Sequence, residues 1–305
     1  MDQAQSLREK MNRLQAERPQ QLQDPLQKTQ YQHHPSSRVI TITSGKGGVG
    51  KSNFSLNFAL GLKAEGKKVV ILDLDLSTAN LNILMGISPR YSLANVLYDQ
   101  IRIWDVIEKG TEGIEFIHGG FDLQHLMNFD QSKLDYFWNQ LNELQSYADY
   151  ILLDTGAGIS KELVDFILAS DETIMVATPE PTSIADAYTV LKTVMSYTTE
   201  QPKLRLVINR AQTYQEAVET SRAFQHACKT ILKLEIQTLG YLLEDLHVRQ
   251  SVKAQKPFLV MYPNSTAAKN MKQIIYSYLP EFTRSGPSSS KGIRGFFEKI
   301  WSRRK

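Results

Sequence analysis

The sequence predicts an α/β protein in which a mostly parallel β-sheet is flanked by helices. Two observations support this fold class. From Arg38 onward, aliphatic and β-branched runs alternate with runs of helical periodicity, as in strands joined by crossover helices. Residues 44–52 also fit the phosphate-binding loop G-x-x-x-x-G-K-[ST]. This loop lies between a β-branched run at 39–43 and an apolar helical pattern at 53–64, which is the strand–loop–helix context of a P-loop NTPase.

The remaining elements follow in order along the chain. Further strands are expected at Lys68–Leu74, Ile114–His118, Tyr150–Asp154, Thr173–Thr178, Leu204–Asn209 and Leu239–Leu243. Helices are expected near Ser132–Tyr147, Lys161–Leu168, Ser183–Tyr197, Tyr214–Leu232 and Thr266–Tyr278. Ligands of such sheets bind at the carboxyl ends of the strands. The polar residues that follow these strands are therefore the first candidates for a site.

Both ends of the chain differ from this alternating region. The first residues place Leu7, Met11 and Leu14 at i, i+4 and i+7, which predicts a short amphipathic helix. The glutamine-rich stretch after it has little to bury and is typical of a disordered tether. The expected segments are a helix at 1–14, a disordered linker at 15–37, an NTPase domain at 38–283, a flexible Ser/Gly linker at 284–290 and an amphipathic helix at 291–305.

Composition limits the class of protein. No apolar run is long enough to span a bilayer, and the N-terminus lacks a signal-peptide core, so we expect a cytoplasmic protein. Cys228 is the only cysteine, which excludes an intrachain disulfide and the paired cysteines of an iron–sulfur cluster. The net charge of +3 is uneven, because residues 291–305 carry +5 and the remainder −2. We therefore expect no broad nucleic-acid surface.

The phosphate loop predicts a nucleotide site. Its glycines, Gly45, Gly47, Gly48 and Gly50, let the backbone approach a phosphate, and the loop amides up to Val49 point at the anion. Lys51 is expected to contact the β- and γ-phosphates, and the Ser52 hydroxyl to ligate Mg²⁺.

Lys46 is an additional cation next to the first glycine of the loop. The segment K-G-G-V-G-K-S resembles the deviant P-loop of the MinD/ParA family of dimerising ATPases. In that family the extra lysine reaches across a nucleotide-sandwich dimer, so the resemblance implies that Lys46 serves the partner's ATP. The resemblance spans roughly residues 38–279.

Two apolar strands end in carboxylates. Asp73 and Asp75 stand at the end of the strand that comes next after the loop, where paired carboxylates are better explained by Mg²⁺ and an attacking water than by chance. The family pattern D-x-D-x-x-x-x-N implies that Asp75 activates the water and that Asn80 approaches the dimer interface. Asp154 ends a strand that resembles a Walker B strand and would hold the Mg²⁺ shell; a helix cap is the alternative role.

The resemblance extends to two further segments. Gly156 and Gly158 match the family's second switch, where glycine lets the backbone shift when the γ-phosphate leaves. Asn209 matches an asparagine that reads adenine, since an amide can pair with N6 and N7, and Arg210 follows it in the nucleotide site. No guanine box of the Asn-Lys-x-Asp type is present, which favours ATP. Asp186, after a Pro-rich turn, is either a partner contact or a helix-dipole carboxylate.

The last fifteen residues combine a bulky apolar face with bases. Ile293, Phe296, Phe297, Ile300 and Trp301 fall at i, i+3, i+4, i+7 and i+8. The pattern favours a helix that lies on an anionic membrane, and MinD-like proteins often end in one. The alternatives are a helix docked on the protein's own core, and a basic helix that binds RNA or an acidic protein.

The first residues resemble a more specific branch. The segment D-Q-A-x-x-L-R matches the N-terminus of the FlhG (YlxH) family, the MinD-like regulators of flagellar number and placement. The resemblance implies that Gln3, Leu7 and Arg8 stimulate the signal-recognition-type GTPase FlhF, and that flagellar switch-complex proteins are further partners. Together these features predict an Mg²⁺-dependent ATPase that dimerises on ATP. The alternatives are a septum-placement MinD, a DNA-partitioning ParA, or a nucleotide-independent adaptor.

Overall fold

The computed structural model describes residues 37–75, 80–120, 131–284 and 292–304. The predictions for residues 1–36, and with them Gln3, Leu7 and Arg8, lie outside these ranges. A single eight-stranded sheet organises the described residues, with the strand order β3-β4-β2-β5-β1-β6-β7-β8. The strands are β1 Arg38–Thr43, β2 Val69–Leu74, β3 Glu108–Lys109, β4 Glu115–His118, β5 Tyr150–Thr155, β6 Glu172–Ala177, β7 Leu204–Ala211 and β8 Gln237–Leu243.

The sheet is parallel except at one edge, where β3 pairs antiparallel with β4. This confirms the predicted fold class. The seven predicted strands are all present, with ends that differ by one or two residues. The two-residue β3 was not predicted, because so short a segment has no detectable period.

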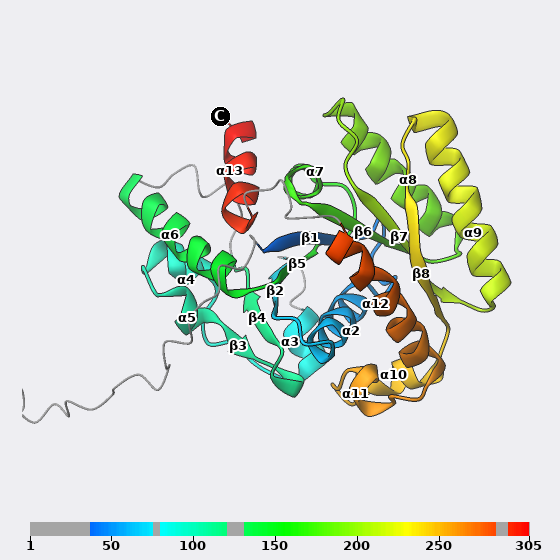
Figure 1. The fold of residues 1–305 in the computed structure, drawn as a ribbon, viewed down its shortest axis with the longest axis horizontal. Coiled ribbons are helices and arrows are strands. Elements are labelled where there is room, and N and C mark those ends of the chain that lie inside the picture. The colour runs from blue at the N-terminus through cyan, green and yellow to red at the C-terminus, as the bar shows by residue number, and fades with distance from the viewer. Residues whose placement is uncertain (1–36, 76–79, 121–130, 285–291, 305) are drawn as a thin grey trace, which may run out of the picture. The chain divides into compact units, whose positions relative to one another are not determined.

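Helices cover both faces of the sheet (Figure 1). They are α2 Lys51–Ala64, α3 Asn80–Met85, α4 Leu93–Tyr98, α5 Ile103–Val106, α6 Gln131–Tyr147, α7 Lys161–Ala169, α8 Pro181–Ser196, α9 Tyr214–Ala227, α10 Leu246–Lys253, α11 Phe258–Met261, α12 Thr266–Arg284 and α13 Gly292–Arg304. The helices predicted within the described residues are present, and α12 continues six residues beyond the predicted Tyr278. Among those not predicted, α3, α4, α5 and α11 have six residues or fewer.

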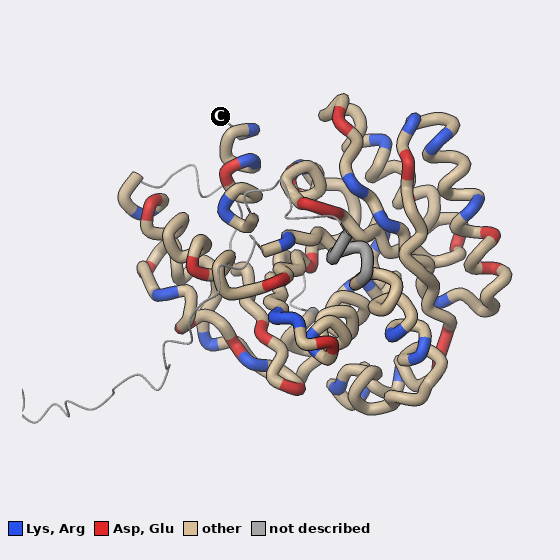
Figure 2. The backbone as a smooth tube through the Cα atoms, in the orientation of Figure 1, with Lys and Arg blue, Asp and Glu red and all other residues tan. Residues whose placement is uncertain are grey.

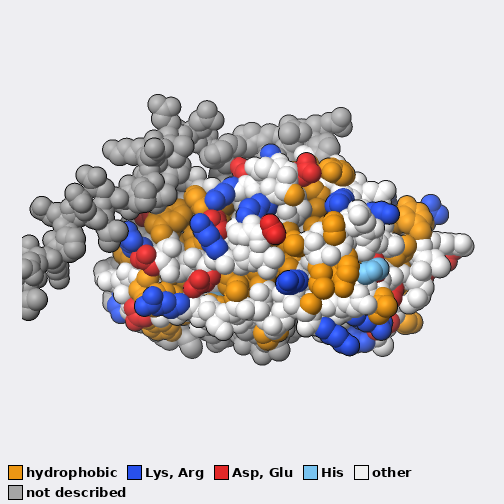
Figure 3. All heavy atoms as spheres, turned by 90° about the horizontal axis from the view of Figure 1, so that it is seen from below, with side chains coloured by type: hydrophobic (Ala, Val, Ile, Leu, Met, Phe, Trp, Pro, Cys, Tyr) orange, Lys and Arg blue, Asp and Glu red, His pale blue; other side chains and the backbone are white. Residues whose placement is uncertain are grey.

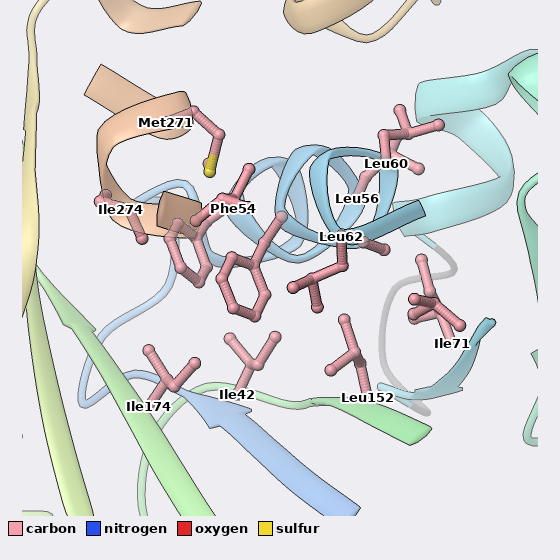
Figure 4. Packing of buried hydrophobic residues seen from close by; sticks show 14 of the residues in the cluster. Ile42, Phe54, Leu56, Leu60, Leu62, Ile71, Leu152, Ile174, Met271 and Ile274 are labelled. Carbon is pink, nitrogen blue, oxygen red and sulfur yellow. The ribbon is translucent and has the colours of Figure 1, made fainter. Parts of the chain in front are cut away.

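The core on one face lies between the sheet and α2. Successive strand residues point to opposite faces, so Ile42 and Leu152 meet α2, whereas Val39 and Leu153 face the other side. Figure 4 shows side chains of α2, among them Phe54, directed at these strands, with Met271 and Ile274 of α12 beside them. This packing holds α2, and with it the start of the helix at the phosphate loop.

The opposite face carries the C-terminal helix. Ile293, Phe296, Phe297 and Ile300 are each at most 1% exposed, and α13 contacts α6, α7 and β1. The docked helix is therefore the arrangement found, and the side chains predicted to face a membrane are covered by the protein itself. In the described part of the chain, no helix has the length and apolarity needed to cross a membrane.

Candidate active site

The phosphate loop lies at the carboxyl end of β1, and α2 begins at Lys51. Gly48 and Gly50 have φ of 78° and 90°, a left-handed conformation that favours glycine. A Cβ at Gly48 would meet nothing within 4 Å, so this side of the loop is open to a ligand. The first-turn amides of α2 and the helix dipole favour an anion at this position.

A cavity of about 950 Å³ opens beside the loop. It runs from the loop and Asp75 to Asn209 and Arg210 near the end of β7, and on to Arg249 and Lys253 of α10. Its volume falls within the range of cofactor sites. Most of the residues predicted to bind nucleotide thus line one cavity with Asp75, although they come from three strand ends far apart in sequence; Gly45, Lys46 and Val49 are not among the lining residues.

Lys51 and Asp154 form an ion pair inside the site. Lys51 Nζ lies 2.9 Å from Asp154 Oδ1 and 3.2 Å from Ser52 Oγ. Ser55, one turn further along α2, places its Oγ 2.7 Å from the same carboxylate oxygen. Both Lys51 and Asp154 are buried, so the pair orients the lysine at the mouth of the loop.

The residues present fit Mg²⁺. Hydroxyl and carboxylate oxygens are its usual protein ligands, and it keeps several waters and substrate phosphate oxygens besides. Asp154 Oδ2 is buried and has no hydrogen-bond partner among the described residues. Ser52 and the carboxylates of Asp75 and Asp154 would hold the ion, in part through water. In the described residues, no group of three or more His, Cys, Asp or Glu side chains could by itself hold a metal ion.

Asp73 and Asp154 stand opposite each other on neighbouring strands β2 and β5. Burial and the nearby Asp154 charge raise the pKa of Asp73 to about 7, against the smaller lowering effects of the Asp75 amide and Lys51. Asp73 Oδ1 accepts the Asp75 amide at 3.2 Å, which orients the turn that carries Asp75. The buried Asp73 carboxyl group thus supports the backbone at Asp75.

The second switch is tied to the phosphate loop through the backbone. Gly158 N donates to Ser44 O at 3.1 Å, and Thr155 Oγ1 donates to Ile42 O at 3.1 Å. Gly158 has φ of 91°, and the α-carbon of Gly156 lies beside Asp75, since a Cβ there would be 3.7 Å from Asp75 Oδ1. The segment thus contacts the loop and lies beside the Asp75 carboxylate. Asn80 begins α3, and its side chain lies outside the described part of the structure.

Asn209 and Arg210 also contact the loop. Asn209 Nδ2 donates to Val49 O at 2.7 Å, which uses one of the two protons of its amide group. Arg210 Nη1 donates to Gly48 O at 3.3 Å, and its Nε pairs with Glu244 at 3.2 Å. The second amide proton and the amide oxygen are the groups with which Asn209 could pair with N7 and N6 of adenine, as predicted from the sequence.

Lys46 lies at the exposed edge of the site. Its Nζ contacts Glu180 Oε2 at 3.2 Å and Thr182 Oγ1 at 3.0 Å, both at the start of α8. The loop itself touches α8, because a Cβ on Gly45 would come within 2.2 Å of the Ala187 nitrogen. The helix after the Pro-rich turn therefore packs directly on the phosphate loop. Asp186 belongs to it, and nothing in its surroundings decides between its two predicted roles.

Several residues of the site were not predicted from the sequence. They are Ser55, Glu180, Thr182, Glu244 and Arg249. For Ser55 a signal exists, because it stands four residues after Lys51 and so shares its face of the helix. The others reach the site only through the tertiary fold: Glu180 and Thr182 contact Lys46, whereas Glu244 pairs with both Arg210 and Arg249.

Comparisons with known proteins agree with this geometry. A family model, ParA, described as NUBPL iron-transfer P-loop NTPase, matches residues 36–278. The flagellum site-determining protein YlxH of Helicobacter pylori is 30% identical over 90% of this chain and 92% of its own length. The antiactivator FleN of Pseudomonas aeruginosa is 31% identical over 79% of this chain and 85% of its own length.

A solved structure shows the same fold with a nucleotide bound. The septum site-determining protein MinD from Pyrococcus horikoshii, complexed with Mg-ADP, aligns with a TM-score of 0.63 and 25% identity. The alignment covers 81% of this chain and 98% of that one. The chain therefore belongs to the MinD/ParA family of deviant P-loop ATPases, with YlxH and FleN among its relatives.

Proposed function

We propose that this protein is an Mg²⁺-dependent ATPase that dimerises on ATP and regulates flagellar number or placement from the cytoplasmic face of the membrane. The observation that carries the proposal is that the loop's two lysines occupy different positions. Lys51 is buried on Asp154, where it serves the protein's own nucleotide. Lys46 is exposed at the edge of the site, 3.2 Å from Glu180, where it is available to a second subunit.

Hydrolysis in this site relies on positioning. The loop amides and Lys51 bind the phosphates, and Asp75, 6% exposed and on the cavity wall, orients and activates the attacking water. Mg²⁺ held through Ser52 and the waters near Asp154 would neutralise charge on the phosphates. Lys46 of a partner subunit adds a second cation, so the complete site forms only in the dimer.

Membrane attachment is proposed to follow from release of α13. Its apolar face is buried, so the docked helix cannot insert into a bilayer. Once released, it would present that face together with its bases to anionic lipids. Two helices on one dimer bind with higher apparent affinity than one. Over the described helices, basic and acidic residues are interspersed (Figure 2), and they are mixed on the face in Figure 3, so neither view shows the broad basic surface that nucleic-acid binding requires.

The N-terminal segment is proposed to stimulate the GTPase FlhF, and flagellar switch-complex proteins are further proposed partners. The likeness to YlxH, named a flagellum site-determining protein, favours this over septum placement or DNA partitioning. The residues assigned to the task are Gln3, Leu7 and Arg8.

The decisive experiment measures the molar mass of the full chain by light scattering in ADP and in ATP. The wild type should be monomeric in ADP and dimeric in ATP. Lys46→Ala should bind nucleotide but remain monomeric, and Asp75→Ala should dimerise and hydrolyse far more slowly. A Lys46→Ala protein that dimerises like wild type would overturn the cross-subunit role, and full biological activity of a Lys51→Ala protein would favour the nucleotide-independent adaptor.

A further inference from the structure

Ser55 is a buried hydroxyl in the middle of α2, with no exposed surface. Its Oγ lies 2.7 Å from Asp154 Oδ1 and 3.1 Å from Lys51 O. A hydroxyl has one proton to donate, and the charged, nearer carboxylate is the stronger acceptor. Ser55 therefore donates to Asp154.

The two oxygens of the Asp154 carboxylate, which Ser55 contacts, have different surroundings. Asp154 Oδ1 accepts from both Ser55 and Lys51, at 2.7 and 2.9 Å. Asp154 Oδ2 is buried and has no hydrogen-bond partner among the described residues. A buried carboxylate oxygen that accepts no hydrogen bond costs folding free energy. A bound ligand can supply the missing donor, and a water molecule of an Mg²⁺ shell would be such a donor.

Bound nucleotide should affect the Lys51 and Ser55 contacts with Asp154 Oδ1 differently. Lys51 is the phosphate-binding lysine, so its ammonium is drawn toward the phosphates when nucleotide enters. The Ser55 side chain is short and is fixed on a buried helix, so its hydroxyl stays beside the Asp154 carboxylate. With Lys51 on phosphate, Ser55 remains to hold Asp154 in place.

We infer that Ser55 is a positioning residue for Mg²⁺ binding, one that acts through Asp154. This inference rests on the proposed ATP and Mg²⁺ site. The hydroxyl fixes Oδ1, and with it the direction in which Oδ2 meets the water shell of the ion. Partners of this kind orient metal-site carboxylates, and their loss typically weakens metal binding about 10- to 100-fold.

The test measures binding in the full-length protein rather than turnover. A fluorescent ADP analogue is titrated in EDTA and at increasing Mg²⁺, for wild type and Ser55→Ala. Ser55→Ala should require about tenfold more Mg²⁺ for half of the Mg²⁺-dependent gain in affinity. Its affinity in EDTA should match that of wild type, because the loop and Lys51 are unchanged.

Two further variants separate positioning from general loss of a buried hydroxyl. Ser221→Ala removes a buried serine of α9 that contacts Val218 O at 3.1 Å and Tyr241 at 3.0 Å, and it should leave the Mg²⁺ dependence unchanged. In an Asp154→Asn background, Ser55→Ala should have little further effect, because both changes act on the same contact. Thermal melting in EDTA checks that each variant is folded.

Three outcomes would overturn the inference. They are an unchanged Mg²⁺ requirement in Ser55→Ala, a loss of affinity as large in EDTA as in Mg²⁺, or an undiminished effect of Ser55→Ala on top of Asp154→Asn. If the wild type itself shows no Mg²⁺-dependent nucleotide binding, the proposed function fails rather than the role of Ser55 alone.

Discussion

Lys46 and Glu180 form an ion pair within one subunit, with 3.2 Å between Nζ and Oε2. The lysine expected to act in the neighbouring subunit thus has a partner in its own chain. Both side chains are about half exposed, at 42% and 56%, so the pair is weak. Its consequence is a competition, since Lys46 has to leave Glu180 to reach a phosphate across the dimer.

Removing that competitor should favour the dimer. Glu180→Gln is expected to strengthen ATP-dependent dimerisation by a few-fold, because exposed ion pairs contribute about 0.2–1 kcal/mol. Sedimentation velocity at several protein concentrations in ATP measures the dissociation constant. Glu219→Gln, an exposed change on α9, is the matched control. A dimer that weakens in Glu180→Gln would mean that Glu180 supports the interface instead.

A substitution outside α13, in the surface on which this helix docks, should be enough to weaken its docking. Phe166 of α7 stacks on Phe296, with ring centroids 5.8 Å apart, and Lys299 Nζ lies 3.4 Å from Ala169 O at the end of α7. Phe166→Leu should weaken the docking of α13 on the body by about 1 kcal/mol, because an aromatic pair typically contributes about that much. Binding to anionic liposomes without ATP should therefore rise several-fold in a sedimentation assay.

The control for that experiment is Phe224→Leu, a buried phenylalanine of α9 in a separate core cluster. Liposome binding that rises equally in both variants would indicate general unfolding. Phe297→Glu is less specific, since Phe297 packs on Phe137 of α6 at 5.8 Å. That variant should lose membrane binding and also weaken the docked state.

A buried glutamate links stability to pH. Glu172 contacts Arg38 at 2.9 Å and Arg205 at 2.7 Å, and Tyr278 donates to it at 3.0 Å. Burial acts to raise the pKa of Glu172, but Arg38, Arg205 and Lys203 together lower it below its ordinary value of 4.5. A lowered folded pKa contributes stability above the unfolded pKa, and this contribution is lost as pH falls through the folded pKa.

Glu172→Gln should therefore lower the free energy of unfolding at pH 7 by about 3–5 kcal/mol, the cost of breaking a buried ion pair. The deficit relative to wild type should shrink as pH falls below 4.5. Urea unfolding at a series of pH values measures both. Glu235→Gln, in an exposed pair with Lys229, should cost less than about 1 kcal/mol at any pH. A deficit in Glu172→Gln that does not change with pH would contradict the linkage.

The N-terminal segment should act without the ATPase domain. A synthetic peptide of residues 1–14 is expected to accelerate GTP hydrolysis by FlhF, because Gln3 can orient a water and Arg8 can neutralise phosphate charge. Gln3→Ala should lose the acceleration and keep binding, whereas Leu7→Ala should lose both. Phosphate release in single turnover measures it. Equal stimulation by the full chain and by a chain lacking residues 1–14 would contradict the assignment of GTPase stimulation to this segment.

Much of the fold could be predicted from the sequence because the signals are local. Aliphatic strands and helical periods mark the elements, and the glycines and lysines of the loop mark the site within nine residues. Short helices such as α3 and α5 escaped prediction, since four to six residues contain little more than one period.

The sequence by itself determined the fold class, the phosphate loop and the carboxylates at the carboxyl ends of β2 and β5, because backbone geometry and strand direction place each of these locally. Only the tertiary structure decided where long or amphipathic side chains lie. The periodicity of the apolar face of α13 is compatible both with a helix on a membrane and with a helix docked on the protein. Its burial against α6 and α7 shows that the docked arrangement is the one present in this structure. Likewise, the partners of Lys46 and Asp154 are set by contacts between elements about 100 or more residues apart, which no local pattern encodes.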